Sequence, residues 1–261
     1  MKKNDIRAQR NIPGLRRRLS QLLDLVMEIM KEPLETSKED HFRLMAFCFL
    51  GRQVEHAKTI LLLIDNEREI DAQLICRSMV EGLTQLLWTA SDPQTRALLW
   101  RSYTFIEVWK QIQRMKAIDE PVDENLLSYV NKGLSIYGEL YYTRKARDKK
   151  EQNLPLPKDP YYKNWYGDNL LNITKEVEGE PIYNEILRPQ AAWHHWSSMS
   201  FGKIITIDNA VMSLSYFSSF TTAIILSCCL LCLGQTAELV NRHLKLNCGS
   251  RLEDMKNELI M

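Results

Sequence analysis

Two apolar runs separated by two residues decide the fold: HFRLMAFCFLGRQVEHAKTILLLI (residues 41–64) and EREIDAQLICRSMVEGLTQLLWT (residues 67–89), joined by Asp65 and Asn66. In each run apolar side chains recur at three- and four-residue steps, which is the period of an α-helix. Two long helices joined by so short a turn must lie antiparallel. Residues 15–30 have the same period, and Ser91-Asp92-Pro93 is typical of the start of another helix, which we expect to reach about residue 117. The sequence therefore predicts an all-α fold, a helical bundle built on long antiparallel helices.

The composition of the chain changes along its length and predicts three parts. Residues 1–36 form a basic helical segment, residues 37–245 form the bundle, and residues 246–261 form a short charged tail. Within the bundle, residues 141–168 are charged, contain prolines and have weak periodicity. We therefore predict a long exposed loop with aromatic anchors there. The only strand-like fragment, IITI at residues 204–207, is too short to build a sheet.

The stretch from Asn209 to Ala237 carries no formal charge and is long enough to span a bilayer. Serines and threonines interrupt it, so we expect the central helix of a bundle, from Asn209 to about His243, and a membrane span is the less favoured alternative. The N-terminal residues are basic and lack the apolar core of a secretory signal. These features together favour a cytoplasmic protein.

The totals and the missing motifs exclude several classes of protein. Lysine and arginine number 34 against 33 aspartate and glutamate, so bulk charge predicts no nucleic-acid or membrane partner. Gly-rich phosphate loops, helical Glu-x-x-His pairs and the Gly-x-Ser-x-Gly elbow do not occur. The cysteines lie mostly in apolar helical runs, and no ligand set accompanies Cys228, Cys229 and Cys232. We predict buried, reduced thiols and expect neither a cofactor nor a metal.

The stretch YNEILRPQAAWHHWSS (residues 183–198) has the most unusual composition in the chain. If a helix runs through it, Arg188 and His195 lie on one face because they are seven residues apart, whereas His194 lies roughly 120° from Arg188. A guanidinium binds phosphate through paired hydrogen bonds, and an imidazole transfers protons near neutral pH. Such a pair could cleave RNA without a metal, with the ribose 2′-hydroxyl as nucleophile. The alternative is an aromatic cluster with Trp193 and Trp196, in which the histidines satisfy buried hydrogen bonds.

A second group of polar residues, Asp71, Arg77 and Glu81, lies in the second apolar run. Arg77 and Glu81 are four residues apart and therefore face each other on a helix. Their neighbours are apolar, so we expect the pair to be at least half-buried. We interpret it as an ion pair that fixes the register of the helices. Alternatively, the group lines a polar pocket opposite Arg188 and His195 and orients the histidine.

Basic residues gather in two short segments. The first runs from the N-terminus to Arg18 and holds Lys2, Lys3, Arg7, Arg10, Arg16, Arg17 and Arg18 against Asp5. The second holds Arg144, Lys145, Arg147, Lys149 and Lys150 against Asp148, near the aromatic residues Tyr141, Tyr142, Tyr161, Tyr162 and Trp165. Either segment could bind a nucleic-acid backbone, with the aromatic rings as stacking surfaces for bases. Solvated charged faces without a ligand are the alternative.

Three motifs together resemble a family of helical bacterial proteins of unknown function: DAQLICRSMVEG (residues 71–82), NWYGDNL (residues 164–170), and Tyr183 followed by RPQAAWHHWS. Its members carry an Arg-Ser-x-x-Glu helix, a Trp-containing loop and an Arg-to-His helix, whose histidine best matches His195. More loosely, the chain resembles the HEPN superfamily, in which four to six residues separate the arginine from the histidine. Six residues separate them here, and Pro189 stands where that superfamily usually has a polar residue.

The HEPN resemblance implies a metal-independent endoribonuclease that acts as a toxin or phage-defence effector and forms a homodimer. His195 and Arg188 would then be catalytic, with His194 as the second histidine, and Arg77, Glu81 and Asp71 would orient them. Arg144, Lys145 and Arg147 are our candidates for RNA binding. The alternative is a non-catalytic helical module that binds a partner protein or RNA.

Overall fold

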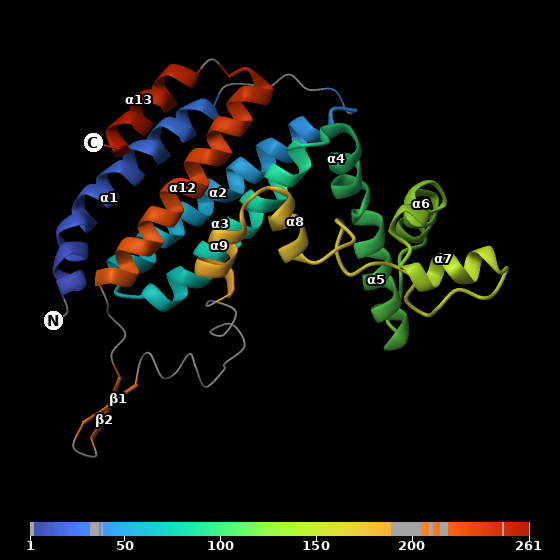
Figure 1. Ribbon diagram of the computed structural model, residues 1–261. Coiled ribbons are helices and arrows are strands. Elements are labelled where there is room, and N and C mark those ends of the chain that lie inside the picture. Colours follow the sequence, from blue (N-terminus) through green and yellow to red (C-terminus); the bar gives the residue numbers. More distant parts are fainter. Residues whose placement is uncertain are drawn as a thin grey trace. The chain divides into compact units, whose positions relative to one another are not determined.

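The computed structural model describes residues 3–31, 37, 39–188, 205–208, 211–214, 219–246 and 248–260 (Figure 1). It divides into two compact units: unit 1 takes its residues from Met1–Trp88 and Ile173–Met261, and unit 2 is Thr89–Asn172. Most of the described residues in both units are helical, which confirms the predicted all-α class. The sequence predicted a single bundle over residues 37–245. The structure separates residues 89–172 from the rest, because these residues contact mainly one another.

Unit 1 is built around three long helices. These are α1 (Lys3–Ile29), α2 (His41–Asp65) and α12 (Ser219–Leu244), and α12 packs against both of the others. Helix α13 (Gly249–Ile260) contacts α12 and α1. Helix α3 (Glu69–Ala90) follows α2, and α8 (Leu170–Glu176), α9 (Glu180–Ile182) and the π-helical turn η2 (Tyr183–Leu187) come later in the chain.

The predicted hairpin of α2 and α3 is confirmed. Asp40 caps α2 by accepting a hydrogen bond from the Arg43 backbone amide at 3.0 Å. At the other end, Glu67 has a left-handed backbone with φ of 57°, and the Arg68 amide donates to the Leu63 carbonyl at 2.8 Å. This hydrogen bond satisfies a carbonyl of the last turn and reverses the chain.

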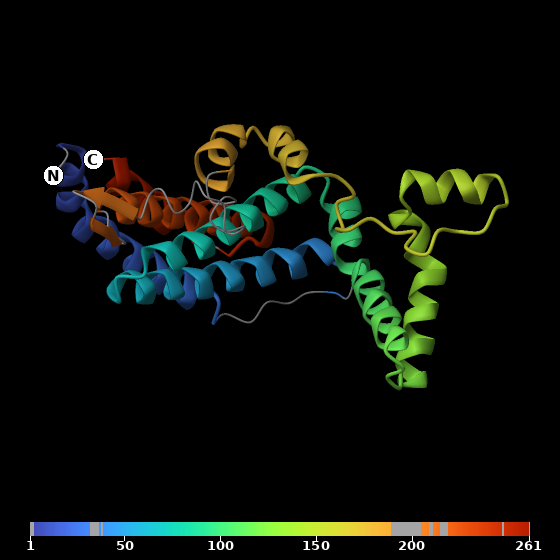
Figure 2. The ribbon, with the colours of Figure 1, turned by 90° about the horizontal axis from the view of Figure 1, so that it is seen from below.

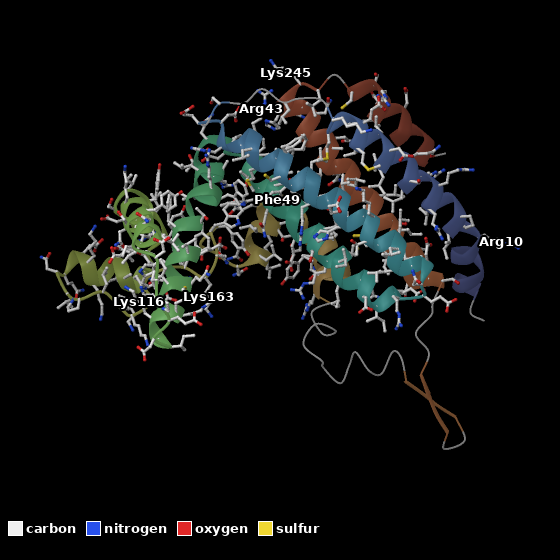
Figure 3. All side chains as sticks on the ribbon, turned by 180° about the vertical axis from the view of Figure 1, so that it is seen from behind. Arg10, Arg43, Phe49, Lys116, Lys163 and Lys245 are labelled. Carbon is white, nitrogen blue, oxygen red and sulfur yellow. The ribbon has the colours of Figure 1, made fainter. Side chains whose placement is uncertain are left out.

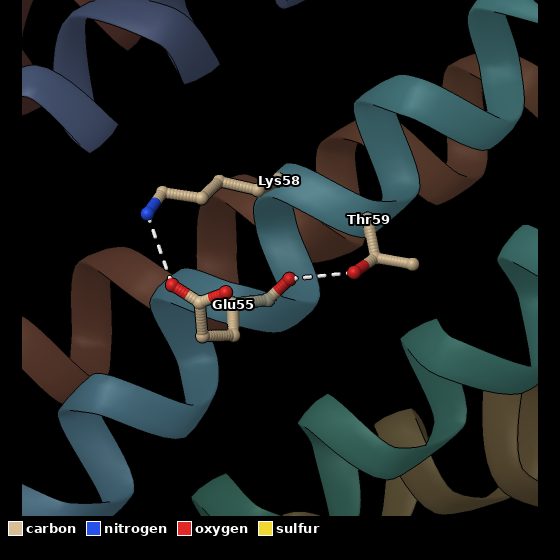
Figure 4. Close-up of polar contacts among 3 residues, drawn as sticks. All are labelled: Glu55, Lys58 and Thr59. Carbon is tan, nitrogen blue, oxygen red and sulfur yellow. Dashed lines mark hydrogen bonds and ion pairs between the residues drawn. The ribbon is translucent and has the colours of Figure 1, made fainter.

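Helix α2 separates its polar and apolar faces in the way that a bundle requires. On its exposed face, Lys58 Nζ donates to Glu55 Oε1 at 2.9 Å, and Thr59 Oγ1 donates to the Glu55 carbonyl at 2.8 Å (Figure 4). On the opposite face Val54, Ala57 and Ile60 are buried. The helix therefore places its apolar stripe against α1 and α12.

Helix α12 is the apolar helix that raised the question of a membrane span. By length and composition it is long and apolar enough to cross a bilayer, but 61% of its most apolar window is buried. Its buried side chains pack against α1 and α2, which is how the central helix of a bundle behaves. It begins at Ser219, so the predicted start at Asn209 was wrong.

Two short strands lie before α12 along the chain. Strand β1 (Ile205–Asp208) pairs antiparallel with β2 (Val211–Leu214), with Ile205 opposite Leu214. The fragment that we judged too short to build a sheet therefore forms one half of a hairpin. The reason is that β-branched residues favour extended backbone once a partner strand supplies the hydrogen bonds.

Unit 2 contains a helical hairpin and a buried aromatic cluster. Its elements are α4 (Pro93–Ser102), α5 (Thr104–Ala117), α6 (Glu124–Tyr137), the 3₁₀ turn η1 (Gly138–Tyr141) and α7 (Arg144–Glu151). Helices α5 and α6 lie side by side (Figures 1 and 2). As predicted, Asp92 caps a helix that has Pro93 in its first turn, although the helix is interrupted at Tyr103.

The predicted exposed loop over residues 141–168 is only partly a loop. It contains α7, which Thr143 caps and which buries Ala146. Tyr141 and Tyr161 are also buried and belong to a cluster with Tyr103 and Ile106. The Tyr141 hydroxyl donates to the Leu99 carbonyl at 2.7 Å. Burial raises the pKa of Tyr141, Tyr161 and Tyr103 to about 12, so these hydroxyls stay neutral.

Candidate functional site

The best-defined polar pair among the predicted site residues is Arg77 with Glu81 on α3. Arg77 Nε donates to Glu81 Oε1 at 2.8 Å, and the two side chains are 24% and 31% exposed. Arg77 Nη1 is buried and has no hydrogen-bond partner in the described part of the chain. The pair is therefore half-buried, as predicted.

The pair lies on the face of α3 that points away from α2. Met79 and Gly82 face α2: Gln53 Nε2 donates to the Met79 carbonyl at 2.8 Å, and a Cβ on Gly82 would lie 3.5 Å from the same nitrogen. Arg77 and Trp88 are eleven residues apart and share the opposite face, because three helical turns contain about 10.8 residues. This face of α3 carries α8 and α9.

Helices α8 and α9 lie beside α3 in both views (Figures 1 and 2). The contact with α8 is specific: Trp88 Nε1 donates to Glu176 Oε2 at 2.7 Å. Ile173 and Thr174 of α8 are buried, and so is Leu187 of η2. The fold thus brings residues 173–188 onto the side of α3 that bears Arg77 and Glu81.

Arg188 directly follows the π-helical turn η2. Its backbone is still helical, with φ of −66° and ψ of −46°, and its side chain is exposed. The preceding residue, Leu187, is only 2% exposed and anchors the turn in unit 1. The predicted partners His194 and His195, and the neighbouring Trp193 and Trp196, lie outside the described residues. The pairing of Arg188 with His195 therefore stays a prediction.

Asp71 does not join the pair on α3. Its side chain is exposed and makes no hydrogen bond or ion pair with the described residues. Six helical steps separate it from Arg77, which places it roughly 120° away around the helix. Asp71 lies in the first turn of α3, where its negative charge interacts favourably with the helix dipole.

The predicted RNA-binding residues lie on α7 in unit 2. Arg144 and Lys145 are exposed, and the Arg147 guanidinium lies 6.0 Å from the centre of the Tyr162 ring. Lys150 is held by an ion pair with Glu139. Charged side chains are therefore exposed along the whole of α7, and Arg147 lies beside an aromatic ring.

Two of the predicted stacking surfaces were wrong. Tyr141 is 1% exposed and Tyr161 is 9% exposed, because both fill the core of unit 2. Tyr142, Tyr162 and Trp165 are half-buried and keep part of each ring at the surface.

The sequence analysis also missed Lys110, which helps to define the surface around Tyr162. Lys110 Nζ donates to the Tyr162 carbonyl at 2.8 Å and lies 5.9 Å from the centre of the Tyr103 ring. No sequence signal links Lys110 to Tyr162, because they are 52 positions apart. Other lysines, such as Lys116 and Lys163, are exposed in this unit (Figure 3).

The predicted site residues thus divide between the two units. Arg77, Glu81 and Arg188 belong to unit 1, and Arg144 to Arg147 belong to unit 2. Their convergence on one polar site stays a prediction. Among the described residues, no group of three histidine, cysteine or acidic side chains could hold a metal ion.

The fold defines a nearly all-helical protein of two units. Residues 43–211 match the model of a family of unknown function, DUF5677, and because this is more than half of the chain, the protein belongs to that family. The match includes α3, α7 and Arg188 and leaves out α1 and α12. No curated protein and no solved structure matches the chain. The resemblance to an uncharacterised helical family is therefore confirmed at the level of the family.

Proposed function

We propose that this protein is a metal-independent endoribonuclease, similar to those of the HEPN superfamily, that acts as a toxin or phage-defence effector. The observation that carries the proposal is the position of Arg188. It is an exposed arginine at the end of a helical turn that is anchored beside α3, seven residues before His195. The sequence pattern supplies the histidine, and the family match covers both residues.

In the proposed reaction, His195 removes the proton from a ribose 2′-hydroxyl, and the 2′-oxygen attacks the adjacent phosphorus. The bond from phosphorus to the 5′-oxygen breaks, and that oxygen takes a proton from an imidazolium. The products are a 2′,3′-cyclic phosphate and a 5′-hydroxyl. Arg188 binds the phosphate and stabilises the charge that develops on it. His194 is the second candidate for the proton donor.

Arg77 and Glu81 have a positioning role in this proposal. The carboxylate of Glu81 holds the guanidinium through Nε, and the buried Nη1 group needs an acceptor, since buried donors are nearly always paired. A phosphate oxygen or a ring nitrogen would satisfy that requirement. The position of the pair on the side of α3 that carries residues 173–188 supports this role.

The test is cleavage of a labelled RNA in the presence of EDTA. Arg188→Ala and His195→Ala should each lower the rate by about 100-fold or more, because His195 transfers protons and Arg188 stabilises the charge that develops on the phosphate. Arg52→Ala removes an exposed arginine from α2 and is the matched control, which should cleave at the wild-type rate. Melting curves establish that each variant is folded. Wild-type activity in both site variants would refute the proposal.

The second candidate function is a non-catalytic helical module that binds RNA or a partner protein. It is favoured by the exposed Arg144 and Lys145 beside the Arg147–Tyr162 contact. If these three cations contact phosphates of single-stranded RNA, replacing all three by glutamine should reduce the salt dependence of binding by about 2 log units per log unit of salt. If the protein is such a binding module, His195→Ala should lower its stability without changing any cleavage rate.

We further propose that the protein is cytoplasmic, as its sequence favours, and that it acts as a homodimer, as the HEPN resemblance implies. The packing of α12 against α1 and α2 supports a core role for the apolar helix. Fractionation without detergent tests the first point, because recovery in the membrane pellet would contradict it. Light scattering of the purified chain tests the second, and a monomeric mass at assay concentrations would contradict it.

A further inference from the structure

Helix α12 lies between α1 and α2 in unit 1 and leaves one apolar stripe at the surface (Figure 1). Phe220, Ile224 and Leu231 are between 40% and 48% exposed, and Ser227 is exposed as well. Successive members are four, three and four residues apart, so all four side chains lie on the same face of the helix. We call these four residues the α12 seam.

The α12 seam lies on a helix without charge. No charged residue occurs from Ser219 to Ala237, whereas the exposed face of α2 carries Arg52, Glu55 and Lys58. A helix face that meets only water is normally polar, as that of α2 is. A continuous exposed apolar surface instead marks a place where a protein or a membrane binds.

The order of side chains along the seam is complementary to a reversed copy of itself. Ile224 lies three residues before Ser227 and Leu231 lies four residues after it, whereas Phe220 and Gly234 lie seven residues on either side. In an antiparallel pair centred on Ser227, Ile224 of each copy is therefore opposite Leu231 of the other. Phe220 is opposite Gly234, which has no side chain to obstruct the ring. The small Ser227 at the centre allows the helix axes to approach to about 8 Å, the short end of the usual range.

Helix α1 runs parallel to α12 along one side of the seam. The Phe42 ring at the start of α2 packs 4.7 Å from the His243 ring at the end of α12, so α2 and α12 are antiparallel. In the first half of α1, Arg16 forms an ion pair with Asp65, the last residue of α2. The first half of α1 therefore lies beside the first half of α12.

The charge of α1 changes sign along this direction. The helix is basic up to Arg18, and from Leu19 to Ile29 its only charged residues are Asp24 and Glu28. An antiparallel pair of α12 helices places both α1 helices on the same side of the pair and in opposite directions. The basic half of each α1 then runs alongside the acidic half of the other, which favours this arrangement electrostatically.

We propose that the α12 seam is the surface through which two copies of this chain pair, antiparallel and about a two-fold axis at Ser227. The proposal rests on the homodimer proposed above and gives it an interface, and it does not depend on ribonuclease activity. Pairing covers the apolar stripe that unit 1 leaves at its surface.

Cysteine crosslinking of the full chain tests the register. A Cys48→Ser background removes the exposed native thiol. In that background Ser227→Cys places one thiol of each copy at the two-fold axis, so mild oxidation should give a covalent dimer on a non-reducing gel. Ile224→Cys is the matched control on the same seam, because antiparallel pairing separates its two copies by about 10 Å along the helix axis. It should not crosslink with itself, whereas a mixture of Ile224→Cys and Leu231→Cys should crosslink.

Leu231→Lys tests the apolar contact without added thiols. The two-fold axis would place two unpaired ammonium groups in the interface, so the dissociation constant of the dimer should rise by about 100-fold or more. Light scattering over a dilution series measures it. Thr59→Lys adds the same charge to the exposed face of α2 and is the control that should leave the constant unchanged. Circular dichroism establishes that each variant is folded.

The possible failures are distinguishable. A monomeric wild type would overturn both this proposal and the proposed homodimer. A dimer that Leu231→Lys leaves intact and Ser227→Cys does not crosslink would overturn the seam alone. Self-crosslinking of Ile224→Cys would refute the antiparallel register. A monomer that binds phosphatidylcholine vesicles, and loses this binding in Leu231→Lys, would assign the seam to a lipid surface instead. The absence of RNA cleavage would count against the ribonuclease proposal and not against the seam.

Discussion

The Arg77–Glu81 pair can be tested by removing its carboxylate. Glu81→Ala deletes the acceptor of a hydrogen bond of 2.8 Å from Arg77 Nε. The guanidinium is then left with Nε unpaired beside Nη1, which is buried and already lacks a partner among the described residues. The variant thus creates an uncompensated charge in a half-buried position.

The exposed fractions of 24% and 31% determine the magnitude that we expect. Breaking a fully buried pair costs about 3–5 kcal/mol, and an exposed pair contributes about 0.2–1 kcal/mol. Glu81→Ala should therefore lower the free energy of unfolding of unit 1 by about 1–3 kcal/mol. Replacing both partners, Arg77→Met with Glu81→Leu, removes the stranded charge and should cost less than about 1 kcal/mol.

The assay is urea unfolding followed by pulsed hydrogen exchange of peptides from α3, which reports on unit 1 alone. Glu55→Ala is the matched control, since the Glu55–Lys58 pair of α2 is exposed (Figure 4). It should cost less than about 0.5 kcal/mol.

The reasoning fails if Glu81→Ala behaves like Glu55→Ala, or if the double variant is as unstable as the single one. A stable double variant that no longer cleaves RNA would assign the pair a positioning role beyond its structural one.

Three further substitutions test other parts of the fold. Tyr141→Phe should cost about 1 kcal/mol in unit 2, because it removes the hydrogen bond to the Leu99 carbonyl; exchange of α4 peptides measures this, and unchanged protection would contradict it. Burial raises the pKa of Glu69 in the folded protein. The protonated carboxyl therefore stabilises the fold below the unfolded pKa of about 4.3, and this stabilisation is lost as the pH rises through the folded pKa. Glu69→Gln should therefore be more stable than wild type at pH 7, and urea melts should show the difference shrinking towards pH 4. Gly133→Ala would place a Cβ 2.2 Å from Phe105 Cδ1 and should cost about 1–3 kcal/mol through overpacking, so an unchanged melting curve would refute the close contact.

Local patterns predicted the elements that depend on near neighbours in the chain. The α2–α3 hairpin, the Asp92 cap and the Arg77–Glu81 pair all follow from spacings of a few residues. The predictions that failed depend on partners elsewhere. An uncharged run from Asn209 has the composition of a helix, but part of it forms β2 because another strand pairs with it. Helix α7 was missed because Ala146 is its only buried residue.

The predictions about the candidate site also divide into those that depend on near neighbours in the chain and those that depend on distant partners. Sequence alone predicted that Arg77 and Glu81 form a half-buried pair, because four residues return a helix to the same face. It also determined the all-α class, through the apolar period of 41–64 and 67–89. Only the tertiary structure decided which face of α3 carries residues 173–188 and that Tyr141 is core. The physical reason is that these contacts join residues far apart in sequence, whose side chains meet only when the helices pack.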